Sequence, residues 1–263
     1  MKTELIYIHV PAQNLAKNVN FLIDNHLQPE VACQDVELDE LNFSQLADVA
    51  AQLQEEGLRT ALHAPYQGYK PGSGNATSQF YSHALTEKSL HLAESLQANR
   101  VIFHPGLAPG NNPRKLEAWL TNSLAFWPQY LSVAERLGAV LCIENIYAPQ
   151  PDTLKQLLDT IDSPYLGHVF DVGHWNMFAR IPLREWLARM APHLKHLHLH
   201  DNPGDQDSHQ AIGSGTVPFD DLFTWLTTHR PDTTMTLENR RLADAQLSLQ
   251  QLKEFYSSPA AEV

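Results

Sequence analysis

The sequence has few cysteines and few basic residues, and both shortages narrow the function. Its two cysteines, Cys33 and Cys142, cannot form a network of disulfide bonds, and neither belongs to the Cys-x-x-Cys pair of a zinc ribbon or thioredoxin-like site. Lys and Arg number 18 against 30 Asp and Glu, and the formal net charge is −12. This balance argues against a broad basic surface for nucleic acid or an anionic membrane, although it leaves room for a local basic groove.

Long apolar runs and linkers are also missing. No segment approaches the ~20 apolar residues that a membrane-spanning helix needs, and the apolar run Leu5–Val10 is shorter than the core of a signal peptide. We therefore expect a cytoplasmic protein with no membrane partner. No Ser/Gly/Pro linker or block of charge divides the chain, so we expect residues 1–263 to form one domain.

Short β-branched apolar runs alternate with longer amphipathic segments along the whole chain, as is typical of repeated βα units. Eight strands are predicted at Leu5–Val10, Pro29–Asp35, Arg59–His63, Arg100–His104, Ala139–Glu144, Gly167–Asp171, His196–His200 and Thr234–Glu238. Eight helices are predicted at Asn14–His26, Phe43–Gln54, Ser78–Leu96, Lys115–Leu137, Asp152–Ile161, Pro182–Met190, Phe219–Thr228 and Leu247–Tyr256. Eight of each is the number that a closed (β/α)₈ TIM barrel requires, although an open doubly wound sheet would show the same alternation.

The third to the eighth predicted strands each finish in or just before a possible metal ligand. In a barrel, the C-terminal ends of all strands meet at one mouth, where the active sites of this fold lie. Three more candidates are expected in the loops just beyond the sixth and seventh strands. The strand-end residues are His63, His104, Glu144, Asp171, His198 and Glu238, and the loop residues are His174, Asp207 and His209.

Each of these residues taken alone has an ordinary structural explanation. A single His at a strand end is more often a hydrogen-bonded structural residue than a ligand, and a single acid is more often a helix cap or a solvated residue. Coincidence at six successive strand ends is much less plausible. Several carboxylates in one partly buried mouth would also repel one another and raise their pKa values, and a bound cation removes that cost. The pattern therefore predicts a divalent-metal site.

Two other histidines keep open roles at this point. His200 shares a strand face with His198, so the alternation of strand side chains does not tell which of them is the ligand. His9 lies near the mouth end of the first strand, where contact with substrate and a structural role are about equally compatible with its position.

Six short motifs follow the strands in order: HAPY, HPG, EN, DVGH, HLHDN and DSH. With them, and with Glu238 at the last strand, the chain resembles the xylose isomerase-like barrel superfamily, in particular the sugar phosphate isomerase/epimerase proteins related to endonuclease IV. The similarity runs from His9 to Tyr256. It implies one divalent ion held by Glu144, Asp171, His198 and Glu238, which favours His198 over His200. The additional ligands of the zinc cluster in endonuclease IV fall on His63, His104, His174, Asp207 and His209.

The sequence also departs from endonuclease IV. The segment Asn202–Asp207 is short and acidic where that enzyme has a longer basic loop, and Ser208 replaces an Arg. The loop Val36–Asn42 contains Glu37, Asp39 and Glu40 and no basic residue. Tyr66 matches an aromatic residue that contacts DNA in that enzyme, but a Tyr at a barrel mouth also suits stacking on a sugar. We therefore expect no nucleic-acid partner.

The leading hypothesis is a metal-dependent isomerase or epimerase of a small sugar, sugar phosphate or polyol-derived ketone. Glu144 and Glu238 would exchange protons with the substrate through a cis-enediolate that the cation stabilises. The alternatives are phosphodiester hydrolysis at abasic DNA sites and a metal- or sugar-binding protein without turnover. Expected contacts to a small carbohydrate substrate come from Tyr66, Trp175, His200 and Arg240, with Tyr147, Phe178 and Arg241 as further candidates.

The ligand types limit which metals the site would suit, but they do not identify a single metal. The Glu/Asp/His/Glu set suits Mn²⁺, Mg²⁺ or Co²⁺, whereas the additional histidines shift the preference toward Zn²⁺ or Fe²⁺. One to three ions are compatible with the ligand count. The sequence does not decide the substrate or the oligomeric state, and a homo-oligomer is compatible with it.

Overall fold

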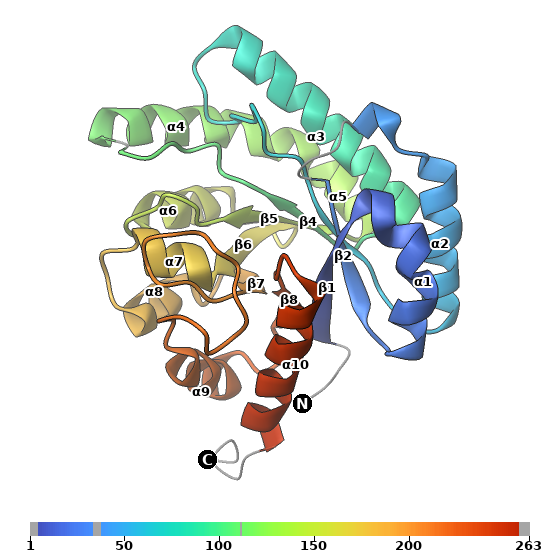
Figure 1. The fold of residues 1–263 in the computed structure, drawn as a ribbon. Helices are drawn as coiled ribbons and strands as arrows, with labels where there is room; N and C mark the ends of the chain where they lie inside the picture. Colours follow the sequence, from blue (N-terminus) through green and yellow to red (C-terminus); the bar gives the residue numbers. More distant parts are fainter. Residues whose placement is uncertain (1–4, 34–37, 111, 258–263) are drawn as a thin grey trace.

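Eight parallel strands form a closed barrel in the computed structural model, which describes residues 5–33, 38–110 and 112–257. Every strand pairs with its sequence neighbour, and β1 closes the barrel by pairing with β8, with Ile6 opposite Met235. The helices surround this barrel on the outside (Figure 1). The predicted (β/α)₈ TIM barrel is confirmed, and strand closure rules out the open doubly wound sheet.

All eight predicted strands are present, with small shifts at their ends. The predicted second strand extends too far, since β2 ends at Ala32, and its predicted last residues Gln34 and Asp35 lie outside the described residues. The strands are β1 (Ile6–Pro11), β2 (Gln28–Ala32), β3 (Ala61–His63), β4 (Arg100–Phe103), β5 (Val140–Glu144), β6 (Leu166–Asp171), β7 (Leu194–Leu199) and β8 (Thr234–Leu237).

The helices depart from the prediction at two places. The predicted single helix Lys115–Leu137 is wrong: Pro128 lacks a backbone N–H, and a 3₁₀ turn at Trp127–Tyr130 separates two helices there. Val172–Phe178 forms a helix that was not predicted. The helices are α1 (Leu15–Asp24), α2 (Phe43–Glu55), α3 (Ala76–Leu96), α4 (Pro113–Phe126), α5 (Leu131–Leu137), α6 (Asp152–Ile161), α7 (Val172–Phe178), α8 (Leu183–Met190), α9 (Phe219–His229) and α10 (Leu242–Ser257). Within the described part of the chain, no helix is long and apolar enough to cross a membrane.

Side chains inside the barrel change from apolar to polar along the strands. Strand residues alternate between the interior and the helix layer, so Cys142 and Glu144 share the interior face of β5, as Val169 and Asp171 do on β6. The lower part of the interior is a small apolar cluster of Tyr7, Ala61, Ile102, Cys142 and Val169. Closer to the C-terminal ends, the interior positions carry acids and histidines, which places the polar residues at the mouth.

Candidate metal centre

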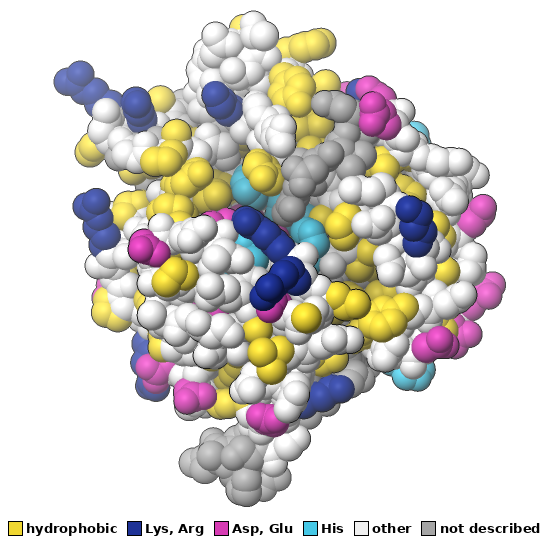
Figure 2. All heavy atoms as spheres, in the orientation of Figure 1, with side chains coloured by type: hydrophobic (Ala, Val, Ile, Leu, Met, Phe, Trp, Pro, Cys, Tyr) yellow, Lys and Arg dark blue, Asp and Glu magenta, His cyan; other side chains and the backbone are white. Residues whose placement is uncertain are grey.

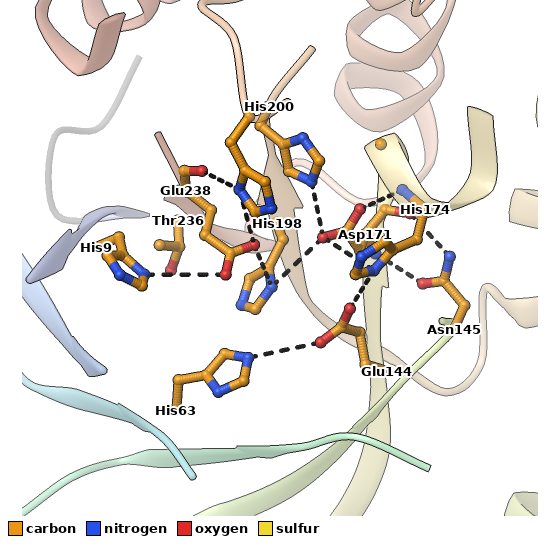
Figure 3. A network of polar contacts seen from close by, with 12 residues as sticks. His9, His63, Glu144, Asn145, Asp171, His174, His198, His200, Thr236 and Glu238 are labelled. Carbon is orange, nitrogen blue, oxygen red and sulfur yellow. Dashed lines mark hydrogen bonds and ion pairs between the residues drawn. The ribbon is translucent and has the colours of Figure 1, made fainter. Parts of the chain in front are cut away.

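The six strand-end residues predicted as ligands all converge on the mouth. His63, Glu144 and Asp171 are the last residues of their strands, and His198 is the last interior residue of β7. Figure 3 shows His63, Glu144, Asp171, His198 and Glu238 pointing toward one another from β3, β5, β6, β7 and the end of β8. All but Glu238 in this group are completely or almost completely inaccessible, and Glu238 is 4% exposed.

Glu144 is the carboxylate around which three histidines gather. Its Oε2 atom lies 3.6 Å from Nε2 of His63 and 3.3 Å from Nε2 of His104. Its Oε1 atom contacts Nδ1 of His174. Two ligand atoms that each lie about 2.0–2.3 Å from one ion are about 3–4 Å apart. The donor atoms of His63, His104 and Glu144 are therefore spaced as ligands of a common cation.

The two carboxylate oxygens of Asp171 contact two candidate ligands, His174 and His198. Its Oδ1 atom accepts a hydrogen bond of 2.6 Å from the backbone N–H of His174 and so caps helix α7. Its Oδ2 atom lies 3.4 Å from Nδ1 of His174 and 3.8 Å from Nδ1 of His198. Asn145, the second residue of the EN motif, exchanges two 2.8 Å hydrogen bonds with the backbone of Asp171 and holds it in place. His174 therefore lies in a helix and not in the loop that we predicted.

His198 links the two halves of the centre. Its Nδ1 atom lies 3.2 Å from Oε2 of Glu238, and its donor atoms also group with those of Glu144 and Asp171. The structure thus brings the four residues of the expected Glu/Asp/His/Glu set together through His198. On its other side, Nε2 of His198 lies 3.1 Å from Oε1 of Glu30, a fully buried residue that the sequence analysis did not single out.

A second group of candidate ligands lies toward the outside of the mouth. Nε2 of His209 and Nε2 of His174 lie 3.2 Å and 3.9 Å from Oδ2 of Asp207. His209 also hydrogen bonds through Nδ1 to the backbone oxygen of Glu238 over 2.6 Å. Two of the five residues that the resemblance assigns as additional ligands, His174 and His209, therefore flank the carboxylate of a third, Asp207, next to the first group.

The residues fit a metal because several buried donor atoms have no hydrogen-bond partner of acceptable geometry. Among residues 5–33, 38–110 and 112–257, this applies to Nε2 of His63, Nδ1 of His198 and Oε2 of Glu144. Unsatisfied buried polar atoms are costly in a folded protein. Since these atoms face one another at ligand spacing, a shared divalent cation satisfies them together.

The pKa values of the site residues also show that negative charge is concentrated at the mouth. Burial opposes ionisation of Glu144, but the neighbouring His104 and His174 hold the pKa of Glu144 well below its usual range. Burial lowers the pKa of His104 to about 4, although the neighbouring Glu144 acts in the opposite direction. Burial also opposes the charged form of His198, but Glu30 and Glu238 raise the pKa of His198 well above its usual value. The carboxylates thus need positive charge beside them, which a divalent ion or bound protons supply.

A cavity of about 410 Å³ opens from these residues to the surface. Tyr66, Tyr147, Lys70 and Arg240 contribute to its walls, together with His9 beside Glu238. Tyr66 stacks on His104, with ring centres 4.3 Å apart and planes 7° apart. Figure 2 shows histidine side chains in a hollow of this face, with Lys and Arg side chains next to them.

Four of the residues proposed to touch substrate, namely His200, Trp175, Phe178 and Arg241, lie outside the cavity wall. His200 has no exposed surface and lies behind the ligands, where Nε2 contacts Oδ2 of Asp171 at 3.2 Å. Trp175 donates its indole N–H to the backbone oxygen of Ile181 over 3.2 Å and packs against the core. Neither of them lines the cavity, and neither does Phe178. The sequence analysis placed Trp175 and Phe178 in a loop after the sixth strand. They lie instead in the short helix α7, which directs them away from the cavity wall.

The structure describes only part of the expected acidic loops. Asp39 lies on the surface and pairs with Lys88. Val36 and Glu37, the first two residues of the expected acidic loop Val36–Asn42, lie outside the described residues. Asp205 is exposed, and Arg241 pairs with Asp244 away from the cavity.

Comparisons with known proteins agree with this fold. Residues 21–255 match the model of a family described as xylose isomerase-like TIM barrel. An uncharacterized protein of Methanocaldococcus jannaschii, MJ1311, is 26% identical over 234 residues, which cover 86% of this chain and 79% of that protein. The TTHB071 protein from Thermus thermophilus, whose structure comes from a ZnCl₂ soak, is 26% identical with a TM-score of 0.81, over 96% of this chain and 98% of that one. A D-tagatose 3-epimerase-like protein is 23% identical with a TM-score of 0.79, over 95% and 97% of the two chains.

Proposed function

The chain belongs to the xylose isomerase-like TIM barrel family, and from this premise we propose that it is a divalent-metal-dependent isomerase or epimerase. Its substrate would be a small sugar, sugar phosphate or polyol-derived ketone. The observation that carries the proposal is the placement of two buried glutamates, Glu144 and Glu238, on either side of His198 at the mouth (Figure 3). The fold shared with a D-tagatose 3-epimerase-like protein supports it.

The metal would be held by Glu144, Asp171, His198 and Glu238. A bound divalent ion supplies a Lewis acid that polarises a carbonyl and lowers the pKa of the adjacent C–H. Manganese, magnesium, cobalt, zinc and iron suit such ligands, and the ZnCl₂-soaked relative makes zinc a useful first probe.

The two glutamates would move the proton. Burial opposes ionisation of Glu144 and Glu238, but nearby histidines hold the pKa values of both below their usual range, so the resting form of each side chain is the carboxylate. Glu144 ends β5 and Glu238 follows β8, so the two carboxylates approach the mouth of the barrel from different sides. One glutamate would remove the proton from carbon and keep it, and the other, which must first take up a proton from solvent, would return that proton to the opposite face of the carbon or to its neighbour.

The cavity walls would orient the substrate. Tyr66 presents a ring held by its stacking on His104, which suits contact with the apolar face of a sugar. Lys70 and Arg240 also line the cavity and would hold a hydroxyl-rich or anionic end.

The test is metal content combined with turnover. We expect protein purified without chelator to contain about one ion per chain by elemental analysis, and to convert at least one ketose in a panel of sugars and sugar phosphates. Chelation should abolish conversion and the divalent ion should restore it. Bound metal and bound sugar without any conversion would instead indicate a binding protein.

A second candidate is phosphodiester hydrolysis at abasic DNA sites. The gathering of His63, His104, His174, Asp207 and His209 around the same mouth favours it, because these are the positions of further zinc ligands in endonuclease IV. About three ions per chain, with incision of abasic duplex DNA, would support this function. The acidic loops oppose it, since a nuclease needs cations to contact phosphates. We expect no binding of abasic duplex at physiological salt.

A further inference from the structure

Glu30 is a buried carboxylate that the proton-transfer scheme does not use. It lies in the middle of β2, it is fully inaccessible, and its side chain enters the barrel interior beneath the metal centre. A buried carboxylate is costly, because its charge loses the solvation of water. The groups that contact Glu30 must therefore offset this cost.

The ring of His198 lies between Glu30 and the metal centre. On one side, Nε2 lies 3.1 Å from Oε1 and 3.3 Å from Oε2 of Glu30, and the contact with Oε2 has hydrogen-bond geometry. On the other side, Nδ1 lies 3.2 Å from Oε2 of Glu238 and 3.8 Å from Oδ2 of Asp171. One nitrogen of the ring thus faces Glu30, and the other faces the candidate ligands.

A chain of hydrogen bonds fixes the carboxylate of Glu30 in turn. Thr236 donates its hydroxyl proton to Oε2 of Glu30 over 2.6 Å. Because this hydroxyl proton is used, the oxygen of Thr236 accepts from Nε2 of His196, 2.7 Å away. Nδ1 of His196 lies within hydrogen-bond distance of the hydroxyl of Thr234, also 2.7 Å away.

This proton assignment leaves one arrangement for His198. An ionised Glu30 offers only acceptors, so Nε2 of His198 must carry a proton and donate it to Glu30. When a metal ion occupies the space shared with Asp171 and Glu238, Nδ1 gives up any proton it carries and presents its lone pair to the ion. Metal-binding histidines commonly donate their second N–H to a carboxylate, which orients the ring and strengthens the ligand.

We propose that Glu30 is a positioning residue that orients His198 so that Nδ1 binds the metal ion. The inference rests on the proposed metal centre and adds to it a residue that does not touch the ion. Glu30 acts through the barrel interior, since β1 and β8 lie between β2 and β7 in the strand order. Thr236 and His196 contribute by holding Glu30.

The test compares zinc affinity in two variants. Glu30→Gln keeps the side-chain size but places an NH₂ donor against the N–H of His198, and we expect the Kd for Zn²⁺ to rise about 10- to 100-fold. Thr236→Val keeps the carboxylate but removes its 2.6 Å hydrogen bond, and we expect a smaller rise. The Kd is measured by competition with a chelator of known affinity. The free energy of unfolding in urea with excess EDTA is measured on the same samples.

The matched control is Thr60→Val. Thr60 is 2% exposed and donates a 2.6 Å hydrogen bond to the backbone oxygen of Leu96, remote from the metal centre. Thr60→Val should destabilise the protein while leaving the Kd for Zn²⁺ unchanged. In zinc-loaded wild-type protein, a two-bond ¹H–¹⁵N spectrum should show the proton of His198 on Nε2, with the resonance assigned from a His198→Gln sample.

The outcomes separate this inference from the proposed function. If the wild-type protein binds zinc and both variants bind it equally well, Glu30 is not a positioning residue, although the metal centre stands. A proton on Nδ1 of His198 in the zinc-loaded protein would also overturn the inference. If the wild-type protein binds no divalent ion, both the proposed metal centre and the role of Glu30 are wrong.

Discussion

His200 fills the space that a side chain on Gly173 would need. A Cβ atom at Gly173 would lie 2.0 Å from Cε1 of His200. In its present position, the His200 ring stacks on His209, with centres 3.8 Å apart and planes 9° apart, and its Nε2 atom contacts Asp171. His200 therefore supports one candidate ligand in each of the two groups, and Gly173 makes room for it.

The variant Gly173→Ala tests this packing. The added methyl group must displace His200, so we expect a loss of about 1–3 kcal/mol in the free energy of unfolding and a weaker zinc affinity. Gly74→Ala is the matched control, because its Cβ would meet its nearest neighbour, Nδ2 of Asn122, at an ordinary 3.7 Å. Urea unfolding with EDTA and zinc titration measure the two effects. Equal stability and zinc affinity of Gly173→Ala and Gly74→Ala would contradict this account.

His168 makes the stability of the protein depend on pH without touching the metal centre. Its Nδ1 atom donates to the backbone oxygen of Ile143 over 2.9 Å, and the indole N–H of Trp186 points at Nε2 from 3.5 Å. A second proton on Nε2 would face this N–H in a buried site. Burial accordingly lowers the pKa of His168 from 6.5 to about 4.

The pH prediction follows from this difference. Between pH 6.5 and pH 4, the unfolded chain binds a proton at His168 that the folded protein does not, so stability falls as the pH falls. The contribution is about 2 kcal/mol lost by pH 5. We expect His168→Gln to lose less stability than wild type between pH 7 and pH 5, measured by urea unfolding with EDTA. An identical loss in both proteins would show that His168 is not responsible.

The residues of the site were predictable where two simple rules apply. Strand alternation and the meeting of strand ends at one mouth indicate His63, His104, Glu144, Asp171 and Glu238 directly. Glu30 escaped because it lies mid-strand in QPEVA, and its partner His198 is 168 residues away in sequence. One signal in the sequence could have found Glu30. It lies two residues after Gln28 in the same strand, so both side chains share one face of that strand, and an acid on the interior face is unusual.

At the level of elements, the short helix α7 depends on Asp171, which ends β6 and caps the helix. The loop between β7 and α9 packs against this helix. Asn202 of the loop donates to the backbone oxygen of Gly173 over 3.0 Å, and Asn176 of the helix donates to Thr216 of the loop over 2.9 Å. Figure 1 shows the segment between β7 and α9 passing beside α7. One carboxylate thus serves both the fold of this region and the candidate metal site.

Two substitutions of Asp171 separate these roles. Asp171→Asn keeps an oxygen that caps the backbone N–H of His174, whereas Asp171→Ala removes it. With metal removed by EDTA, we expect Asp171→Ala to be about 1 kcal/mol less stable than Asp171→Asn, as is typical for a lost cap. Both variants should bind zinc more weakly than wild type, because neither has the charged oxygen. Wild-type zinc affinity in Asp171→Asn would remove Asp171 from the ligand set.

Helices were less predictable than strands, for reasons of local chemistry. The apolar periodicity of Lys115–Leu137 continues through Pro128, so the pattern predicts one helix, although the missing N–H of proline breaks the backbone ladder. Helix α7 has only seven residues, DVGH reads as a loop, and its stability comes from the Asp171 cap and from packing.

At the scale of the whole molecule, the barrel joins an apolar lower interior to a polar mouth. The βα repeat predicted the number of strands, but only the pairing of β1 with β8 distinguishes the barrel from an open sheet. The expected single domain remains an inference, which the match of residues 21–255 to one family agrees with. Hydrogen bonds between strands that are not paired, such as Thr236 on β8 to Glu30 on β2, could not be predicted because they depend on the closure of the barrel through β1.

The most direct measurement is exchange of a carbon-bound substrate proton with solvent. The metal-loaded protein is incubated in D₂O with a panel of ketoses and ketose phosphates, and deuterium at carbon is followed by NMR. We predict metal-dependent deuterium incorporation into at least one compound. In Glu144→Gln and Glu238→Gln, assayed at metal concentrations that saturate each variant, incorporation should be abolished while the small ligand still binds, because the amide cannot accept the proton. No incorporation into any compound, together with efficient incision of abasic DNA by the same preparation, would contradict the account.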